Sequence, residues 1–275
     1  MRVSTDLSEL AVTVAGEGEP VLFIHGGFFG GVFEAACNAP ALRDDYRVIA
    51  YSRHGYGNSS KPEEPYTIDD VVQDALTVLR QAGGERGHIV AHSAGGPYAL
   101  KLAMDYPDAV HTLTLMEPVL PTAAWGEFLA EHFVPAGEAL ANGDREKALD
   151  LSFGAIYGST KYRTEMDPFM PDGWLEQAVA DIDYLFQFES PALRKFSFGP
   201  EEAAKIRQPV FLLRGDQSVP VLIFHNEQMK EWVPHAEEYV VAGGNHAFPV
   251  TQGDETTRAL ASFLAKHPMN DGSTQ

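Results

Sequence analysis

Ser93 is the residue whose surroundings point most directly to chemistry. It lies in the stretch AHSAG, where a short apolar run ends and a helical pattern begins. The small residues Ala91, Gly95 and Gly96 surround it. A serine hydroxyl becomes a nucleophile only when a base takes its proton and hydrogen-bond donors stabilise the oxyanion that follows. A sharp strand-to-helix turn would hold the hydroxyl clear of the sheet, whereas an ordinary helix N-cap would explain the serine but not its small neighbours.

The base that we expect for this serine is His246. It follows the last apolar run of the chain in a Gly-Gly-Asn turn, a position that favours catalysis over a surface role. His25 and His92 are expected to pack or hydrogen-bond around the site, with His92 in the pocket wall. His54 occupies a position where arginine or another polar residue often stands.

Short apolar runs that alternate with helical patterns must position these residues. The runs span residues 21–25, 47–52, 88–92, 111–116, 210–214 and 238–242. They predict buried strands of a mostly parallel sheet, because fully covered strands are apolar throughout. Residues 67–84 predict a helix that begins after Thr67 as N-cap, with Asp69 and Asp70 in its first turn and glycines at its end. Alternating strands and helices indicate an α/β fold.

The alternation stops between about residues 118 and 200, where the pattern is helical. Residues 121–200 contain 13 aromatic residues, a density above the 11% of the whole chain. We expect most of these rings to form the segment's own core and some, Trp125 and Phe128 among them, to cover an apolar pocket. The predicted domains are a core of residues 1–118 and 201–268, a helical cap of residues 119–200, and a disordered tail of residues 269–275.

These motifs together resemble the α/β-hydrolase family over residues 21 to about 267. HGG at residues 25–27 is similar to the family's oxyanion loop, and SRHGYGNS at 52–59 to its arginine-glycine turn. AHSAG resembles the nucleophile elbow, with alanine where the family usually has its first glycine, and GGNHAF at 243–248 resembles the loop of the catalytic histidine.

The resemblance implies an α/β-hydrolase fold whose mostly parallel central sheet is flanked by helices, with a helical cap inserted after the sixth strand. It implies that Ser93 attacks, that His246 moves the proton, and that the backbone N–H groups of Gly27 and Ala94 form the oxyanion hole. Phe28 would then belong to an apolar wall on the oxyanion loop.

The acid of the triad has two candidates. The commonest family pattern places an aspartate three residues after the glycine that ends the seventh strand, but here Ser218 stands three residues after Gly215. Asp216 is two residues early. A second family arrangement places a glutamate directly after the sixth strand, where this chain has Glu117. We favour Glu117 and keep Asp216 as the alternative.

The resulting expectation is a cofactor-independent serine hydrolase that cleaves a small, largely apolar ester or lactone through an acyl-enzyme. A serine at the elbow argues against the dehalogenase and epoxide-hydrolase branches, which use aspartate. One alternative is a hydrolase of carbon–carbon bonds in ring-cleavage products, whose carboxylates would require arginines such as Arg163 or Arg194. Another is a non-catalytic ligand receptor on the same fold.

Composition limits the partners. The formal net charge of −19 and pI near 4.8 oppose binding to nucleic acid or anionic membranes. A single cysteine, Cys37, allows no internal disulfide and is expected to be a small buried hydrophobe. We expect no cofactor and no metal, because neither a phosphate-binding loop nor metal-ligand spacing is present. With no signal-peptide pattern and no apolar run of membrane-spanning length, the chain is expected to be a cytoplasmic monomer or homodimer acting on a small molecule.

Overall fold

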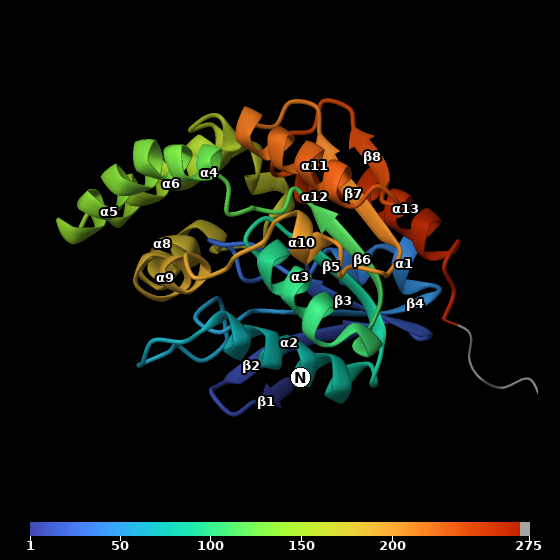
Figure 1. Ribbon diagram of the computed structural model, residues 1–275. Helices are drawn as coiled ribbons and strands as arrows, with labels where there is room; N and C mark the ends of the chain where they lie inside the picture. Colours follow the sequence, from blue (N-terminus) through green and yellow to red (C-terminus); the bar gives the residue numbers. More distant parts are fainter. Residues whose placement is uncertain (270–275) are drawn as a thin grey trace, which may run out of the picture.

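A single eight-stranded sheet organises the chain, and helices cover its two faces (Figure 1). The computed structural model describes residues 1–269. The strand order is β1-β2-β4-β3-β5-β6-β7-β8, antiparallel between β1 and β2 and between β2 and β4, and parallel elsewhere. The strands are β1 Arg2–Ser4, β2 Glu9–Ala15, β3 Glu19–Ile24, β4 Tyr46–Tyr51, β5 Gly87–His92, β6 Val110–Met116, β7 Val210–Gly215 and β8 Glu237–Val241.

The sequence prediction of an α/β fold with a mostly parallel sheet is confirmed, since the six predicted strands correspond to β3 to β8. The first two strands were missed. Strand β2 lies toward the antiparallel edge of the sheet, and only Leu10 and Val12 of its seven residues are buried. Its apolar residues therefore alternate with polar or half-exposed ones, and no continuous apolar run marks the strand.

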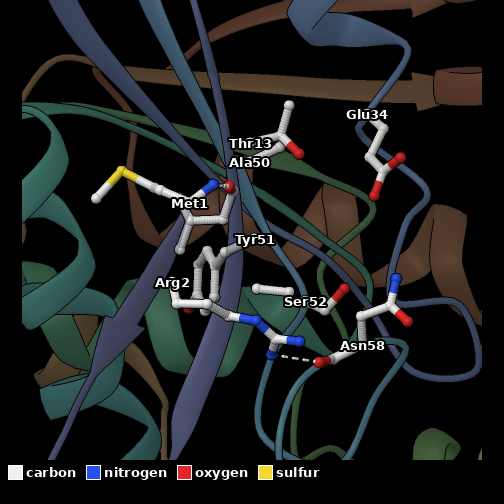
Figure 2. A pocket seen from close by; sticks show the side chains of 11 residues that line it. Met1, Arg2, Thr13, Glu34, Ala50, Tyr51, Ser52 and Asn58 are labelled. Carbon is white, nitrogen blue, oxygen red and sulfur yellow. Dashed lines mark hydrogen bonds between the residues drawn. The ribbon is translucent and has the colours of Figure 1, made fainter.

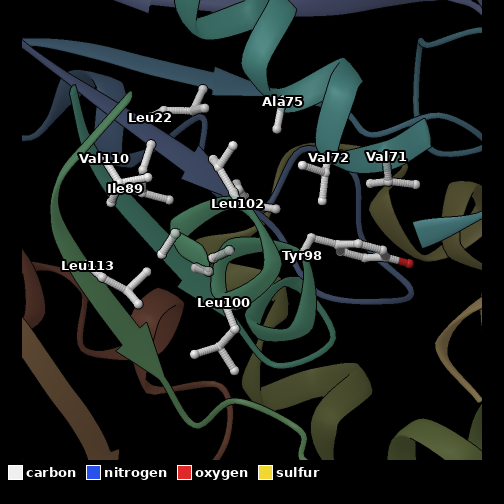
Figure 3. Close-up of a cluster of buried hydrophobic side chains, with 14 of the residues drawn as sticks. Leu22, Val71, Val72, Ala75, Ile89, Tyr98, Leu100, Leu102, Val110 and Leu113 are labelled. Carbon is white, nitrogen blue, oxygen red and sulfur yellow. The ribbon is translucent and has the colours of Figure 1, made fainter. Parts of the chain in front are cut away.

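The two faces of the sheet pack against different helices because side chains alternate along each strand. In β3, Leu22 and Ile24 join the hydrophobic cluster that contains α2 and α3, whereas Val21 and Phe23 join the cluster on the other face with α13. Figure 3 shows the first cluster, with Ala75 of α2 beside the side chains of α3 and the strands. Cys37 is buried in the second cluster, as predicted.

The helices that flank the sheet, and those beyond β7, have the following bounds. They are η1 Ala36–Asn38, α1 Pro40–Arg43, α2 Ile68–Ala82, α3 Gly95–Asp105, η2 Pro107–Ala109, α10 Pro200–Ala203, α11 Pro220–Trp232, α12 Phe248–Thr251 and α13 Gly253–Leu264. Helix α2 begins as predicted, because the Thr67 hydroxyl accepts from the Asp70 N–H and the Asp70 carboxylate accepts from the Thr67 N–H. It ends at Gly83, where a Cβ would lie 2.6 Å from Pro20 Cβ.

All elements that the structure describes between β6 and β7 are helices, and we call residues 123–193, which hold all of these helices except α10, the helical insertion. They are α4 Ala123–Phe128, η3 Leu129–Phe133, α5 Val134–Ala141, α6 Arg145–Tyr157, α7 Tyr162–Glu165, η4 Asp167–Phe169, α8 Trp174–Tyr184, η5 Leu185–Glu189 and α9 Ser190–Leu193. Segments η3 and η5 are π-helical. Several aromatics pack inside the insertion: Phe153 meets Tyr162 edge to face at 5.0 Å, and Tyr162 meets Trp174 at 6.5 Å.

The core of the insertion continues into the loop after β3. The Phe29 ring lies 4.6 Å from the Phe153 ring and 5.4 Å from the Trp174 ring. The insertion is thus joined to the sheet domain by apolar packing at the loop that carries the HGG motif.

The parallel strands end at a common edge of the sheet. Ile24 of β3 pairs with Ala91 of β5, and Met116 of β6 pairs with both His92 and Leu213 of the strands on either side. The loops that follow these strands therefore meet, and they hold the residues to which the sequence assigned chemistry.

Within residues 1–269, no helix combines the length and the apolar character needed to cross a membrane. The tail predicted to be disordered falls, except for Met269, outside the described residues.

Gly95 is the residue whose size the turn after β5 restricts most. A Cβ there would lie 2.4 Å from the Ile24 carbonyl oxygen and 2.8 Å from that of His25. We expect Gly95→Ala to lower the free energy of unfolding by about 2 kcal/mol, because backbone atoms must shift. Gly154→Ala in α6 is the control, since its Cβ would find its nearest neighbours at 3.8 Å and should not destabilise. Urea unfolding measures both, and equal stabilities would contradict the prediction.

Candidate active site

Three side chains converge at the carboxyl ends of the parallel strands. Ser93 follows β5, Glu117 follows β6 and His246 lies in the loop after β8. The first two have positive φ angles, 55° for Ser93 and 45° for Glu117. Such backbone is unfavourable for residues with a side chain, and it concentrates at functional sites. Ser93 thus occupies the sharp turn that the sequence predicted.

Small residues make the turn around Ser93 possible. Gly26 passes so close that a Cβ on it would lie 2.8 Å from Ser93 Cβ. At Gly96 a Cβ would lie 2.5 Å from Pro118 Cβ. Ala91 is fully buried. Gly95 and Gly96, which the sequence singled out as small, are therefore small because another segment crosses each of them.

Glu117 is the carboxylate in contact with the histidine. His246 Nδ1–H donates to Glu117 Oε2 at 2.6 Å, and both side chains are buried. The other oxygen, Oε1, accepts from the Gly215 N–H at 2.8 Å and from the Ser218 hydroxyl at 2.5 Å. The carboxylate is thereby oriented by three donors, and His246 Nε2 is left as the ring nitrogen able to accept a proton.

Asp216 lies elsewhere. It is exposed, and its Oδ1 accepts from the Gly243 N–H at 2.8 Å and from the Gln217 amide at 3.2 Å. Its hydrogen bonds thus organise the turn that precedes His246. The geometry favours Glu117 as the acid, and Ser218, which stands where an aspartate was expected, donates to that glutamate.

The predicted oxyanion donors lie beside Ser93. Gly27, Ala94 and Ser93 line one cavity. Within residues 1–269, the backbone N–H groups of Gly27 and Ala94 donate to no other protein group. Two unused N–H groups beside a nucleophile are the arrangement that stabilises a developing oxyanion.

The two histidines predicted to surround the site hydrogen-bond to backbone. His25 Nε2 accepts from the Arg53 N–H at 2.7 Å, and its Nδ1–H donates to the Gly26 carbonyl at 2.6 Å. His92 Nε2–H donates to the His246 carbonyl at 3.0 Å, with the two rings 4.5 Å apart. Burial lowers the pKa of both His25 and His92 well below the ordinary value, so both rings are neutral.

An apolar cavity of about 660 Å³ opens beside Ser93. The oxyanion loop contributes Phe28, and the helical insertion contributes apolar side chains that include Trp125, Phe133, Leu185 and Phe186. Arg194 is the one charged residue among the residues that line it. The prediction that Phe128 lines the pocket is wrong: it stacks on Trp125 with the ring centroids 5.2 Å apart and is not among the lining residues.

A smaller cavity contains Ser93, His246 and His92, together with Phe28 and Phe153. A third, of about 270 Å³, lies at the sheet edge between Thr13, Glu34 and Tyr51 and shares no lining residue with the other two (Figure 2). The two cavities that Ser93 lines are therefore walled mostly by apolar residues. In the described part of the chain, the His, Cys, Asp and Glu side chains form no group of three or more suited to a metal ion.

A family model described as the alpha/beta hydrolase fold matches residues 19–251. The chain belongs to the α/β-hydrolase fold family. This hydrolase is 26% identical to a fluoroacetate dehalogenase of Burkholderia sp. over 92% of its own length and 89% of the relative's. It is 28% identical to a putative carbamate hydrolase, RutD, of Cronobacter turicensis over 90% of its own length and 92% of the relative's.

Two solved structures show the same fold. The enol-lactonase from Burkholderia xenovorans LB400 superposes with a TM-score of 0.77 at 18% identity, covering 96% of this chain and 100% of that chain. A thermophilic esterase from Thermogutta terrifontis does so with a TM-score of 0.77 at 19% identity, covering 98% of this chain and 99% of that chain.

Sequence reasoning missed two parts of this hydrolase's site. The first is Ser218. The family pattern marks it only as a serine where an aspartate is usual, but it follows β7, the neighbour of β6, and its hydroxyl therefore reaches Glu117. The second is Glu189, which pairs with Arg53 beneath the oxyanion loop. Nothing in the local pattern around Glu189 distinguishes it from other acidic residues of the insertion, so no sequence signal was available.

Reaction with the organophosphate paraoxon tests the roles of the two carboxylates. We expect Ser93 to be phosphorylated and Glu117→Gln to slow the reaction by about 10³-fold, because the charge that stabilises the histidinium is lost. Asp216→Asn, the matched control, should react at nearly the wild-type rate. Peptide mass mapping locates the adduct and p-nitrophenol release gives the rate. A slow Asp216→Asn with a fast Glu117→Gln would reverse the assignment.

Proposed function

We propose that this chain is a serine hydrolase that cleaves a small, largely apolar ester or lactone without a cofactor. The observation that carries the proposal is the buried hydrogen bond between Glu117 and His246. Ser93 lies on a separate strained turn that presents it to an apolar cavity. Two of the similar structures are named as an enol-lactonase and an esterase, which supports the choice of a lactone or an ester as the substrate.

The reaction would begin with attack of Ser93 Oγ on the substrate carbonyl while His246 Nε2 takes the hydroxyl proton. Glu117 would stabilise the charged imidazole, and the N–H groups of Gly27 and Ala94 would bind the oxyanion. His246 then returns the proton to the departing alcohol or ring oxygen. A water molecule activated by the same imidazole would release the acid and restore the serine.

Residues 119–200 would act as the cap of a core formed by residues 1–118 and 201–268. The support is the cavity lining, to which the insertion contributes Trp125, Phe133 and Phe186 and the core contributes Phe28. Binding would bury the apolar part of a substrate between the two, and it would exclude bulk water from the acyl-enzyme.

Dehalogenation, the activity in the name of one relative, is disfavoured by the nucleophile. A serine that displaced a halide from carbon would be left as an ether, which water does not cleave under mild conditions. A carboxylate nucleophile would instead give an ester that water can hydrolyse. With Ser93 at the elbow, turnover requires a carbonyl substrate.

Hydrolysis of carbon–carbon bonds is the second candidate, and Arg194 favours it. This arginine lines the apolar cavity, and its guanidinium would meet a substrate carboxylate there. Arg163, the other arginine considered, pairs with Asp150 at 2.9 Å and does not line the cavity. The hypothesis of an ester or lactone substrate is preferred because the other residues that line the cavity are uncharged.

The first test replaces the nucleophile. We expect Ser93→Ala to remove roughly 10⁴-fold or more of the turnover of short p-nitrophenyl esters and simple lactones, with the fold and melting temperature preserved. Burst release of p-nitrophenol by the wild type would reveal the acyl-enzyme. A Ser93→Ala enzyme with wild-type turnover would refute the serine mechanism, and a wild type with neither burst nor turnover would favour a ligand receptor.

The second test concerns the cavity wall. Trp125→Ala should lower kcat/KM by about fourfold for each substrate methylene that loses its apolar contact, so the loss should grow with acyl length. Phe169→Ala is the matched control, because this aromatic residue lies in the same insertion but is 48% exposed and outside the lining. Initial rates on p-nitrophenyl acetate through octanoate measure the trend. A length-independent effect would place the acyl chain elsewhere.

A further inference from the structure

Glu189, in the helical insertion, is the buried charge that the proposed reaction leaves unused. Its carboxylate faces the Arg53 guanidinium at 2.7 Å, with side-chain exposures of 0% and 1%. The same carboxylate accepts hydrogen bonds from the phenols of Tyr56 and Tyr98. Buried ion pairs seldom stabilise a fold more than apolar residues of the same shape would. The groups to which Arg53 donates therefore indicate what this pair does.

Arg53 donates hydrogen bonds to the oxyanion loop, the HGG segment at residues 25–27. Its Nε–H donates to the His25 carbonyl at 2.9 Å, and its Nη2–H donates to the Gly26 carbonyl at 2.8 Å. Burial by itself would lower the pKa of Arg53, but the Glu189 carboxylate and the neighbouring tyrosines raise it above its ordinary value. The guanidinium therefore stays charged, and its bonds to these carbonyls are charge-assisted.

Holding the Gly26 carbonyl also sets the direction of the Gly27 N–H. The two groups belong to one planar trans peptide unit, in which C=O and N–H point in opposite directions. Arg53 and the His25 ring, whose Nδ1–H also donates to this carbonyl at 2.6 Å, draw the carbonyl toward the buried side of the loop, so the N–H is aimed the other way. Gly27 lines the cavity with Ser93, and this N–H is one of the two expected oxyanion donors.

This peptide unit needs an external hold. It lies between two glycines, Gly26 and Gly27, whose lack of a Cβ leaves their backbone angles the least restricted of any residue. The insertion reaches it directly as well: a Cβ on Gly27 would lie 3.2 Å from Leu185 Cδ1 and 3.9 Å from Glu189 Oε2. The π-helical segment η5 therefore brings both the wall and the charge to the loop.

We propose that Glu189 is a positioning residue of the oxyanion hole, which acts through Arg53 on the peptide unit between Gly26 and Gly27. The inference rests on the proposed function, because it assigns a role in the same acyl transfer. It also gives the insertion a part in the reaction beyond covering the pocket. The oxyanion hole is complete only when Glu189 of η5 is in contact with Arg53 of the core.

Asp181 supplies a matched control. It is a second buried carboxylate of the insertion, eight residues before Glu189, and it is 1% exposed. It also binds the loop after β4, through Lys61 and through the Gly57 N–H at 2.7 Å. Unlike Glu189, it does not pair with Arg53, the residue that bonds to the oxyanion loop. Loss of its charge should destabilise the contact of α8 with the loop after β4 but leave η5, Arg53 and the Gly26–Gly27 peptide in place.

The test compares Glu189→Gln with Asp181→Asn. In Glu189→Gln we expect kcat to fall by about tenfold with KM nearly unchanged, since the N–H acts on the transition state and not on bound substrate. The affinity for 1,1,1-trifluorooctan-2-one, which adds to the serine and forms an oxyanion, should fall by a similar factor. The affinity for octan-2-one, which forms no stable adduct, should not change. Asp181→Asn should lower the melting temperature but keep kcat and the ratio of the two ketone affinities.

The double variant Arg53→Met/Glu189→Met keeps the test decisive if the single variant folds poorly. Apolar replacement of a buried ion pair preserves folding in other proteins. This variant loses both bonds from Arg53 to the loop carbonyls, so we expect kcat to fall by about 100-fold. A folded double variant with wild-type kcat and ketone ratio would overturn the proposal.

The same measurements separate this proposal from the proposed function. Formation of the trifluoromethyl ketone adduct is followed by ¹⁹F NMR and requires no turnover. If the wild type forms the adduct and the Glu189 variants form it equally well, only the positioning role is wrong. If Ser93→Ala keeps its turnover, the serine mechanism is wrong. If the wild type forms no adduct, both proposals fall.

Discussion

The carboxylate of Glu117 is the point at which the candidate site is assembled. It comes from the end of β6, accepts from Gly215 at the end of β7 and from Ser218 in the loop that follows, and holds His246 from the loop after β8. Loops after three neighbouring strands therefore share one buried negative charge. A buried carboxylate is tolerated only when hydrogen-bond donors satisfy its oxygens, so Glu117 requires these donors to stay in place. The positive φ of Glu117 shows that the backbone bends to place it there.

A comparable arrangement holds the other side of the site. The Arg53 guanidinium joins the oxyanion loop to Glu189, as Glu117 joins the histidine loop to β7. In both cases a buried charge is bonded to a loop at or beside its glycines, which have no side chain of their own to pack. Apolar packing alone could not set the direction of a peptide group, because it is not directional, whereas charged hydrogen bonds are.

The helical insertion combines both kinds of interaction. Aromatic packing around Phe153 and Phe29 seats it on the core, and the buried carboxylates Asp181 and Glu189 fix its orientation against the loop after β4. Its other end, around α4 and η3, has no buried residue and forms the outer wall of the cavity. The wall that would meet a substrate is therefore loosely packed, whereas η5, nearest the oxyanion loop, has Leu185 and Glu189 buried.

The sequence by itself determined the sheet, the turn at Ser93 and the loop of His246, because these depend on local patterns: apolar runs, small residues at fixed offsets and glycines at helix ends. It missed β2, whose edge position breaks its apolar run, and it left Glu117 and Asp216 both open as the acid. Only the tertiary structure distinguished between these carboxylates, since the register of β6 against β7 brings Glu117 to His246 and turns Asp216 toward Gly243. Glu189 could not be found locally at all, because its partner lies far away in the chain and the contact arises only when the insertion folds back onto the core.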